Sequence, residues 1–192
     1  HQRSVFWFRL VDFDPAILGR INAVKKENLA FDSYFCTHHF FGKGNWIWLI
    51  PMRTGEYRNM LSIGIVMRPD LFPGSIQTGE DFMEQVTREH DVIRELVESG
   101  TIIDTNVYRN YIHHTRQRYS PEGWFIIGDA ADAVDPLYSI GLGLVSLQTR
   151  QVGAMIQGDI DGTLSEEFVK DMDEAFVGFR QNAADQVTDL YE

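Results

Sequence analysis

The stretch that decides the fold is Gly123–Leu144, which reads GWFIIGDAADAVDPLYSIGLGL. Its apolar run, Trp124–Ile127, is ended by the pair Gly128-Asp129, and short apolar runs bounded by Gly are typical of buried strands. From Ser139 onward, an apolar segment punctuated by Gly predicts a helix that continues to about residue 156. The stretch therefore predicts a strand, an acidic tip, a loop and a helix N-terminus.

This arrangement is suited to ligand binding. The Asp129 carboxylate at a strand end can accept hydrogen bonds from sugar-like hydroxyl groups, and a helix N-terminus presents unpaired N–H groups with partial positive charge. Gly141 and Gly143 would let a flat ligand or an anion approach the backbone. The residues alone leave a second interpretation open, namely a tight strand-to-helix turn of any α/β domain.

A second pattern lies upstream at Trp46–Pro51, which reads WIWLIP. In a strand, Trp46 and Trp48 face one side and the residues between them face the other. Two large flat side chains on one face can line a cavity or fill a core, and periodicity alone favours the core. Because proline lacks an N–H group, Pro51 is expected to end the strand pairing.

The remaining elements follow from apolar periodicity and turn residues. Asp14 before Pro15 and Thr78 with Asp81 are helix-start patterns, and Thr163 or Ser165 is expected to cap the last helix. Three successive strands with short turns predict an antiparallel meander, and residues 101–119 are expected to be extended. The other predicted elements are strands over Ser4–Val11, Phe31–Phe41, Trp46–Met52 and Met60–Met67, and helices from Pro15 to about Glu27, from Phe82 to about Ser99 and from Phe168 to Leu190.

The predicted fold class is α+β in three parts. Residues 1–119 form an antiparallel or mixed β-sheet domain with helices, of the substrate-binding type. Residues 120–160 carry the strand, Gly-Asp turn, loop and helix. Residues 161–192 begin a C-terminal helical region. With 44% apolar residues, the 192-residue chain can bury a sizeable core.

Composition excludes several classes of protein. The net charge of −11 argues against nucleic-acid binding, which needs a basic face. No run approaches the ~20 apolar residues of a membrane span, and there is no signal-peptide pattern. The single cysteine, Cys36, excludes an internal disulfide and fits a cytoplasmic protein.

The residues 128–131 (GDAA) and 135–143 (DPLYSIGLG) resemble the second flavin-binding motif of FAD-dependent monooxygenases and halogenases. The resemblance implies that the middle part of the chain is the C-terminal portion of an incomplete, Rossmann-like FAD-binding domain. Within the motif, it implies that Asp129 holds the ribityl chain and that the Ser139–Gly143 backbone lies near the flavin ring. The WIWLIP run at Trp46–Pro51 resembles the signature of flavin-dependent halogenases, where it lies near the flavin.

The resemblance implies three sets of site residues. The FAD-binding residues are Gly128, Asp129, Pro136, Gly141, Leu142 and Gly143. A chloride or bromide ion would be bound by Ser139, Ile140 and Gly141, consistent with an anion at a helix N-terminus. The wall of the active site would consist of Trp46, Trp48, Ile50 and Pro51.

The sequence also departs from the family pattern. The family's N-terminal G-x-G-x-x-G loop has no counterpart here, and its essential lysine is matched by none of Lys25, Lys26, Lys43 and Lys170. No catalytic residue is therefore assigned. We expect the chain to be the central and C-terminal part of a longer flavoprotein and to be inactive by itself. Tyr138 stands where tryptophan-specific members carry Glu, which favours a phenolic, pyrrolic or carrier-bound substrate.

The resemblance implies an FAD-dependent halogenase-like oxidoreductase that acts on an electron-rich aromatic or carrier-bound substrate through a peroxyflavin and hypohalous acid. A separate flavin reductase would supply reduced flavin. The alternatives are a flavin monooxygenase or reductase on the same scaffold, and a non-catalytic binding fragment.

No metal site is expected. The adjacent pairs His38-His39 and His113-His114 point to opposite faces of a strand, so neither pair can give two ligands to one ion. Asp135 is interpreted as a cap or loop brace. The arginines Arg109, Arg116 and Arg118 are expected to be solvated at the surface.

Overall fold

The computed structural model describes residues 2–21, 33–86 and 88–191. These residues form two compact units. The first, here called the sheet unit, comprises Arg3–Arg109 and Tyr191. The second, the helical unit, comprises Asn110–Leu190 together with Gln2. Each unit is described by itself.

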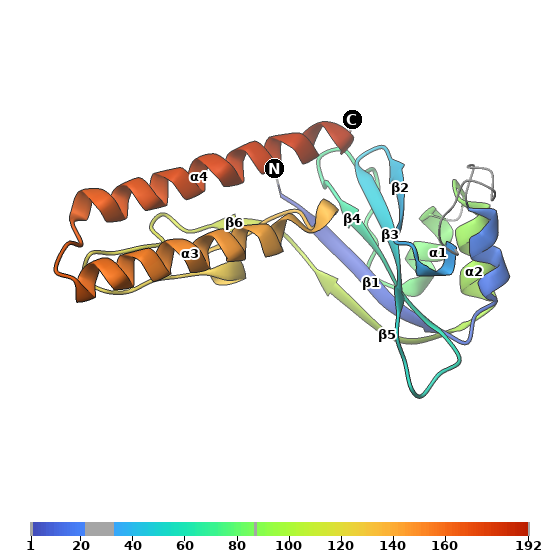
Figure 1. Cartoon of the computed structure of the whole chain (residues 1–192). Helices are drawn as coiled ribbons and strands as arrows, with labels where there is room; N and C mark the ends of the chain where they lie inside the picture. The colour runs from blue at the N-terminus through green and yellow to red at the C-terminus, as the bar shows by residue number, and fades with distance from the viewer. Residues whose placement is uncertain (1, 22–32, 87, 192) are drawn as a thin grey trace. The chain divides into compact units, whose positions relative to one another are not determined.

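The sheet unit is built on one five-stranded antiparallel sheet in the order β2-β3-β4-β1-β5 (Figure 1). Strands β2, β3 and β4 form the predicted meander, and the Gly42–Asn45 turn closes its first hairpin. The predictions for Ser4–Val11 and Met60–Met67 are confirmed residue for residue. The bounds are β1 Ser4–Val11, β2 His38–Gly42, β3 Asn45–Met52, β4 Met60–Met67 and β5 Thr101–Tyr108.

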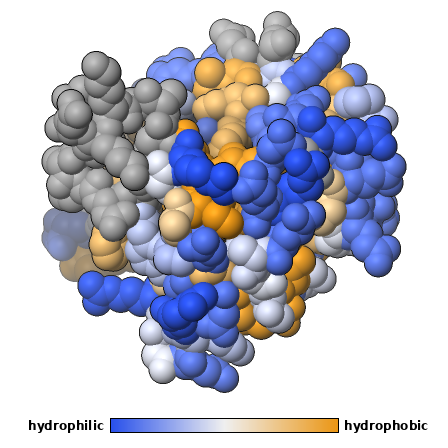
Figure 2. Space-filling view, turned by 90° about the vertical axis from the view of Figure 1, so that its right-hand side faces the viewer, coloured by the Kyte–Doolittle hydropathy of each residue, from blue (hydrophilic) through white to orange (hydrophobic). Residues whose placement is uncertain are grey.

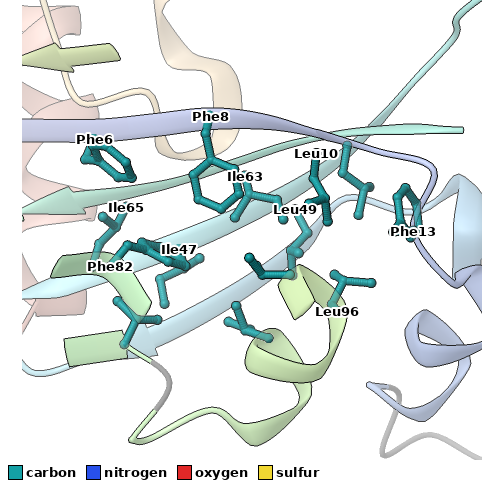
Figure 3. Close-up of a cluster of buried hydrophobic side chains, with 14 of the residues drawn as sticks. Phe6, Phe8, Leu10, Phe13, Ile47, Leu49, Ile63, Ile65, Phe82 and Leu96 are labelled. Carbon is teal, nitrogen blue, oxygen red and sulfur yellow. The ribbon is translucent and has the colours of Figure 1, made fainter. Parts of the chain in front are cut away.

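One face of the sheet carries the core. Alternate residues of the central strands point to this face and interdigitate with side chains from the helices, as Figure 3 shows for Phe8, Leu49, Phe82 and Leu96. The ring of Phe82 packs edge-on against Phe8 at a centroid distance of 5.2 Å. Since these side chains are fully buried, the unit's own helices close this part of the face.

Two helices cover the core face of the sheet, α1 (Gly79–Val86) and α2 (Asp91–Glu98). The predicted cap of α1 is confirmed, because Asp81 accepts from the backbone N–H of Thr78 and Thr78 Oγ1 accepts from that of Asp81. The outer surface of this layer is largely hydrophilic, with apolar atoms visible between the polar side chains (Figure 2).

Three predictions for the sheet unit need correction. The single helix from Phe82 to about Ser99 is wrong, since α1 and α2 are separate. The strand predicted over Phe31–Phe41 is confirmed only in its last part: a 3-10 turn, η3 (Ser33–Phe35), precedes the shorter β2, and residues 31 and 32 lie outside the described residues. The helix after Asp14 is a 3-10 helix, η1 (Pro15–Arg20), with its predicted Asp14 cap present; the rest of that prediction lies outside the described residues.

The prediction that Pro51 ends strand pairing is wrong as well. Strand β3 continues to Met52, and Pro51 is in register with Leu61 of β4. Strand β2 pairs with β3 only as far as Leu49. Because β2 does not reach Pro51, the missing N–H costs no hydrogen bond on that side of the strand.

The helical unit consists of two long helices and a short ribbon. Helices α3 (Ile140–Ile160) and α4 (Glu166–Thr188) pack side by side, and β6 (His113–His114) pairs with β7 (Asp132–Ala133). The 3-10 segments are η4 (Gly128–Ala130), η5 (Leu137–Ser139) and η6 (Asp189–Tyr191), whose Tyr191 belongs to the sheet unit. Ser165 caps α4 as predicted, through the Phe168 N–H. No helix among the described residues is long and apolar enough to cross a membrane.

The predicted buried strand Trp124–Ile127 is wrong. The run forms only an isolated bridge between Phe125 and Tyr119, and the side chains of Trp124 and Ile127 are exposed. A strand needs neighbours on both sides to bury an apolar run. Within the described residues, only the Arg118–Ser120 segment hydrogen-bonds to it, so the run stays extended without becoming part of a sheet.

Candidate functional site

The turn after Trp124–Ile127 has the shape that the Gly-Asp pattern predicts. Gly128 adopts a left-handed conformation with φ +65°, which glycine tolerates without steric cost. The chain then makes the 3-10 turn Gly128–Ala130, closed by the Ala131 N–H donating to the Gly128 carbonyl. Asp129 stands exposed on this turn, so its carboxylate is available to a ligand.

A buried glutamine of α3 hydrogen-bonds to the backbone of the Gly-Asp turn. The backbone N–H of Gly128 donates to Oε1 of Gln148 over 2.8 Å, and Gln148 is only 1% exposed. Since a buried amide is costly unless it is satisfied, its contact with Gly128 fixes the position of the Gly-Asp turn.

The loop before α3 is braced in the way the sequence predicts. Asp135 accepts a hydrogen bond of 3.1 Å from the Leu137 N–H, as expected of a loop brace. Tyr138 and Ser139 then both adopt left-handed conformations, with φ 62° and 56°. Such conformations are uncommon outside Gly and mark functional or strained segments.

The first turn of α3 is open. Ser139 at the N-cap makes no side-chain capping hydrogen bond, so no side chain of that residue shields the first N–H groups of the helix. A β-carbon added at Gly141 or Gly143 would meet no atom within 4 Å. Leu142 beside them is 77% exposed. The predicted contacts Ser139, Ile140, Gly141, Leu142 and Gly143 therefore lie at one accessible helix end, which has room for a flat or anionic ligand.

A buried charge cluster surrounds Asp132, which lies between the Gly-Asp turn and α3. The sequence did not predict this cluster. Asp132 binds Arg118 Nε at 2.5 Å and Arg180 Nη1 at 3.0 Å, and all three side chains are buried. Arg118 also reaches Asp173 of α4 at 3.0 Å. The expectation of a solvated Arg118 is wrong, because its guanidinium joins the ribbon to α4.

His114 completes this cluster. Its Nδ1 lies 3.0 Å from Asp132 Oδ1 across the β6–β7 ribbon. Burial of the ring lowers the pKa of His114, and the nearby positive charge of Arg180 lowers it further. These effects outweigh Asp132, which acts to raise it. The cluster therefore favours a neutral imidazole.

The two tryptophans of WIWLIP share one face of the sheet, as predicted, and their rings are 5.6 Å apart. That face is the one opposite the core, although periodicity alone favoured the core. The Trp46 indole N–H donates to the Tyr191 hydroxyl over 2.7 Å, and the Trp48 N–H donates to Ser62 Oγ over 3.1 Å. Trp46 is buried and Trp48 is half-buried. Both indoles are thus held by hydroxyl groups rather than by packing alone.

The other two wall residues occupy different surroundings. Ile50 shares the face of the tryptophans and is 39% exposed. Pro51 points to the other face and borders a hollow of about 410 Å³ whose lining includes Tyr34 and Arg53. Neither tryptophan lines this hollow, so Pro51 is separated from the aromatic pair.

The histidines and lysines considered in the sequence lie in different parts of the fold. No cluster of three or more potential metal ligands occurs among the described residues, and the strand pairing places His38 in the core face and His39 on the opposite face. Lys43 lies in the β2–β3 turn, and Lys170 is exposed and pairs with Glu174 on α4. Lys25 and Lys26 lie outside the described residues.

Some of the missed residues had a detectable signal. Gln148 lies on the buried stripe of α3 with Leu144, Gln151 and Met155, a spacing that predicts a buried amide. Tyr191 and Arg118 had no such signal, because their partners are far away in the sequence.

Curated relatives of the chain are flavin-dependent halogenases. The chain is 29% identical over 152 residues to the flavin-dependent halogenase chlA of Dictyostelium discoideum, covering 79% of this chain and 24% of that protein. It is 32% identical over 119 residues to the tetracycline 7-halogenase of Kitasatospora aureofaciens, covering 55% and 19%. The chain thus spans about a quarter of the length of the curated relatives it matches. No protein-family model matches the chain.

Solved structures give the same fold. The flavin-dependent brominase Bmp2 superposes with a TM-score of 0.71 at 19% identity, covering 97% of this chain and 43% of that one. The halogenase PltM superposes with a TM-score of 0.70 at 13% identity, covering 92% and 36%. The mixed α/β architecture with its antiparallel sheet is therefore a fold that the chain shares with these solved structures.

Proposed function

Because the chain is a relative of the flavin-dependent halogenases, we propose that it forms part of an FAD-dependent halogenase-like oxidoreductase. The proposed substrate is an electron-rich aromatic compound, free or attached to a carrier. The observation that carries the proposal is the Gly-Asp turn clamped by Gln148 beside the open first turn of α3. These features lie at the positions that the flavin motif assigns to cofactor contacts.

The residues present fit FAD. Asp129 is exposed and can accept hydrogen bonds from ribityl hydroxyls, with Gly128 setting its position. Gly141 and Gly143 leave space along the first helical turn, where Leu142 and the preceding Pro136 are exposed. Partial positive charge at this helix end would stabilise negative charge on a reduced ring. Bound flavin would supply the oxygen chemistry that oxidises halide.

The same helix end is the proposed halide site. The proposed halide residues Ser139, Ile140 and Gly141 lie at a helix N-terminus that has no side-chain cap. The Ser139 N–H donates to the Pro136 carbonyl over 2.9 Å, so a halide would depend on the N–H groups that follow it. Chloride and bromide carry one negative charge and need no directional ligand, so uncapped N–H groups suffice to hold them.

The proposed wall for the aromatic substrate is the pair Trp46 and Trp48 with Ile50. Their flat and apolar surfaces would orient a planar ring and exclude water from it. Pro51 is the fourth proposed wall residue, but its side chain faces the hollow. It would therefore affect the wall only by shaping the backbone of β3.

The full activity is proposed for a longer protein that contains this chain. The 192 residues would contribute flavin, halide and substrate contacts, while a separate reductase supplies reduced flavin. No residue of the chain is assigned as catalytic, and the isolated chain is expected to be inactive. A cytoplasmic location stays a prediction.

The test is a product assay on the full-length protein with supplied reduced FAD, oxygen and a phenolic substrate, with and without bromide. A brominated product that forms only with bromide supports the proposal. A hydroxylated product irrespective of bromide would favour a monooxygenase on the same scaffold, and consumption of reduced flavin without a modified arene would contradict both.

A further inference from the structure

Gly64 lies in the middle of β4, where a glycine is unfavourable. It is in register with Trp48 of β3 on one side and with Trp7 of β1 on the other. Gly in a strand interior weakens the strand unless another group approaches the backbone closely. The reason for a glycine here should therefore be a group that lies directly over it.

That group is the Trp48 indole. A β-carbon added at Gly64 would lie 2.2 Å from Cζ2 and 2.3 Å from Cη2 of Trp48, whereas ordinary van der Waals contact begins at 3.4 Å. The six-membered ring of Trp48 thus occupies the space that any other side chain at position 64 would need. Trp48 leans across β4 instead of standing upright on β3.

Ser62 fixes the other end of the same ring. Its Oγ accepts the indole N–H of Trp48 over 3.1 Å, and it lies two residues from Gly64 on the same face of β4. Two positions of β4 therefore set both the height and the orientation of the indole, one by absence of a side chain and the other by a hydrogen bond.

Trp48 is the accessible member of the tryptophan pair. Trp46 is 3% exposed and its N–H is bound by Tyr191, while Trp48 is half-buried. Trp7, the other neighbour of Gly64, is also half-buried. A ring that lies low over β4 rises less above this face than an upright ring would.

We propose that Gly64 is a specificity-determining residue for the aromatic substrate, and that Ser62 is a positioning residue that acts through Trp48. The inference rests on the proposed function, because it takes the Trp48 face as the substrate wall. Because Gly64 has no side chain, the Trp48 indole lies close to β4. The site can then admit planar electron-rich arenes larger than a single ring. The height of the indole thus sets the size of substrate that the site accepts.

The test is calorimetric binding of phenol and of 1-naphthol to the full-length protein without halide, so that no turnover occurs. Gly64→Ala should raise the Kd of 1-naphthol by roughly tenfold and that of phenol by less than about threefold, because the lifted indole excludes the second ring. Trp48→Phe in the Gly64→Ala background should restore 1-naphthol binding, because the smaller ring no longer meets the added methyl group.

Gly55→Ala is the matched control, since an added β-carbon there meets no atom within 4 Å; it should change neither Kd. Near-UV circular dichroism should show an altered tryptophan signal in Gly64→Ala. If Gly64→Ala fails to fold, Ser62→Ala gives the second variant, and it too should weaken 1-naphthol more than phenol.

Equal loss of both ligands in Gly64→Ala, unchanged binding, or no arene binding by the unmodified protein would overturn the inference. The predicted pattern of binding without any halogenated product would leave the inference standing and contradict only the proposed function.

Discussion

The Gly128 backbone N–H donates a 2.8 Å hydrogen bond to Oε1 of Gln148, a side chain that is 1% exposed and 20 residues further along the chain. This contact ties the Gly-Asp turn to the helix whose N-terminus follows it. One amide therefore sets the position of Asp129 relative to the open turn of α3, and the proposed cofactor contacts depend on it.

Gln148→Leu should lower the free energy of unfolding by about 1–3 kcal/mol, because it leaves the Gly128 N–H without its acceptor. Urea unfolding followed by far-UV circular dichroism measures the change. Gln157→Leu, on the exposed side of the same helix, is the control and should stay within about 0.5 kcal/mol. Equal stability of Gln148→Leu and the unmodified protein would show that the contact does not hold the turn.

Asp129→Ala should weaken FAD binding to the full-length protein by about 1–3 kcal/mol, through loss of charge-assisted hydrogen bonds to the ribityl chain. Equilibrium titration of flavin fluorescence measures the affinity. Asp171→Ala, an exposed carboxylate of α4, should have no effect. Unchanged FAD affinity in Asp129→Ala would rule out the ribityl assignment.

Asp132→Asn should destabilise the protein by about 3–5 kcal/mol, because two buried guanidinium groups lose their common carboxylate. Thermal or urea unfolding detects a loss of this size directly. Asp171→Asn serves as the matched control. A loss below about 1 kcal/mol would mean that the cluster is not the brace between the ribbon and α4.

The lowered pKa of His114 predicts a pH dependence with a definite sign. The unfolded state binds a proton near pH 6.5, above the pKa of the folded state, so the stabilisation is present above that value and is lost as pH falls below it. His114→Gln should flatten this part of the stability curve, and His113→Gln should not. Stability that rises on acidification from pH 7 to pH 5, reversed by His114→Gln, would contradict the argument.

Tyr191→Phe should cost about 1–3 kcal/mol, since it removes the acceptor of the buried Trp46 indole N–H. The same change should alter the tryptophan emission spectrum. Tyr108→Phe is the control, because Tyr108 is 51% exposed. If the two substitutions have the same effect, the hydrogen bond does not position Trp46.

Local patterns predicted much of the fold. The meander, the Thr78–Asp81 cap and the helix after Ser139 were accessible because alternation, turn residues and capping groups act within a few residues. The prediction of a buried strand at Trp124–Ile127 was wrong because it depended on contacts distant in the sequence. Whether an apolar run is a buried strand depends on its neighbours, and the described residues give it only one bridge.

The site was predictable only in part. Asp129 and the glycines of α3 belong to one contiguous motif, so the sequence could suggest them as cofactor contacts, and that assignment stays a prediction. The groups that hold the site come from far away: Tyr191 meets Trp46 across 145 residues, and Arg180 meets Asp132 across 48. Such pairs depend on tertiary structure, and neither residue type nor spacing indicates them.

The most direct test of the central claim, that the Gly128–Gly143 stretch contacts flavin, is amide hydrogen exchange of the full-length protein with and without FAD. Bound FAD should slow exchange at the Gly-Asp turn and in the first turn of α3, and should leave exchange unchanged at the exposed end of α3 near Ile160. Full FAD occupancy with no protection anywhere in Gly128–Gly143 would contradict it.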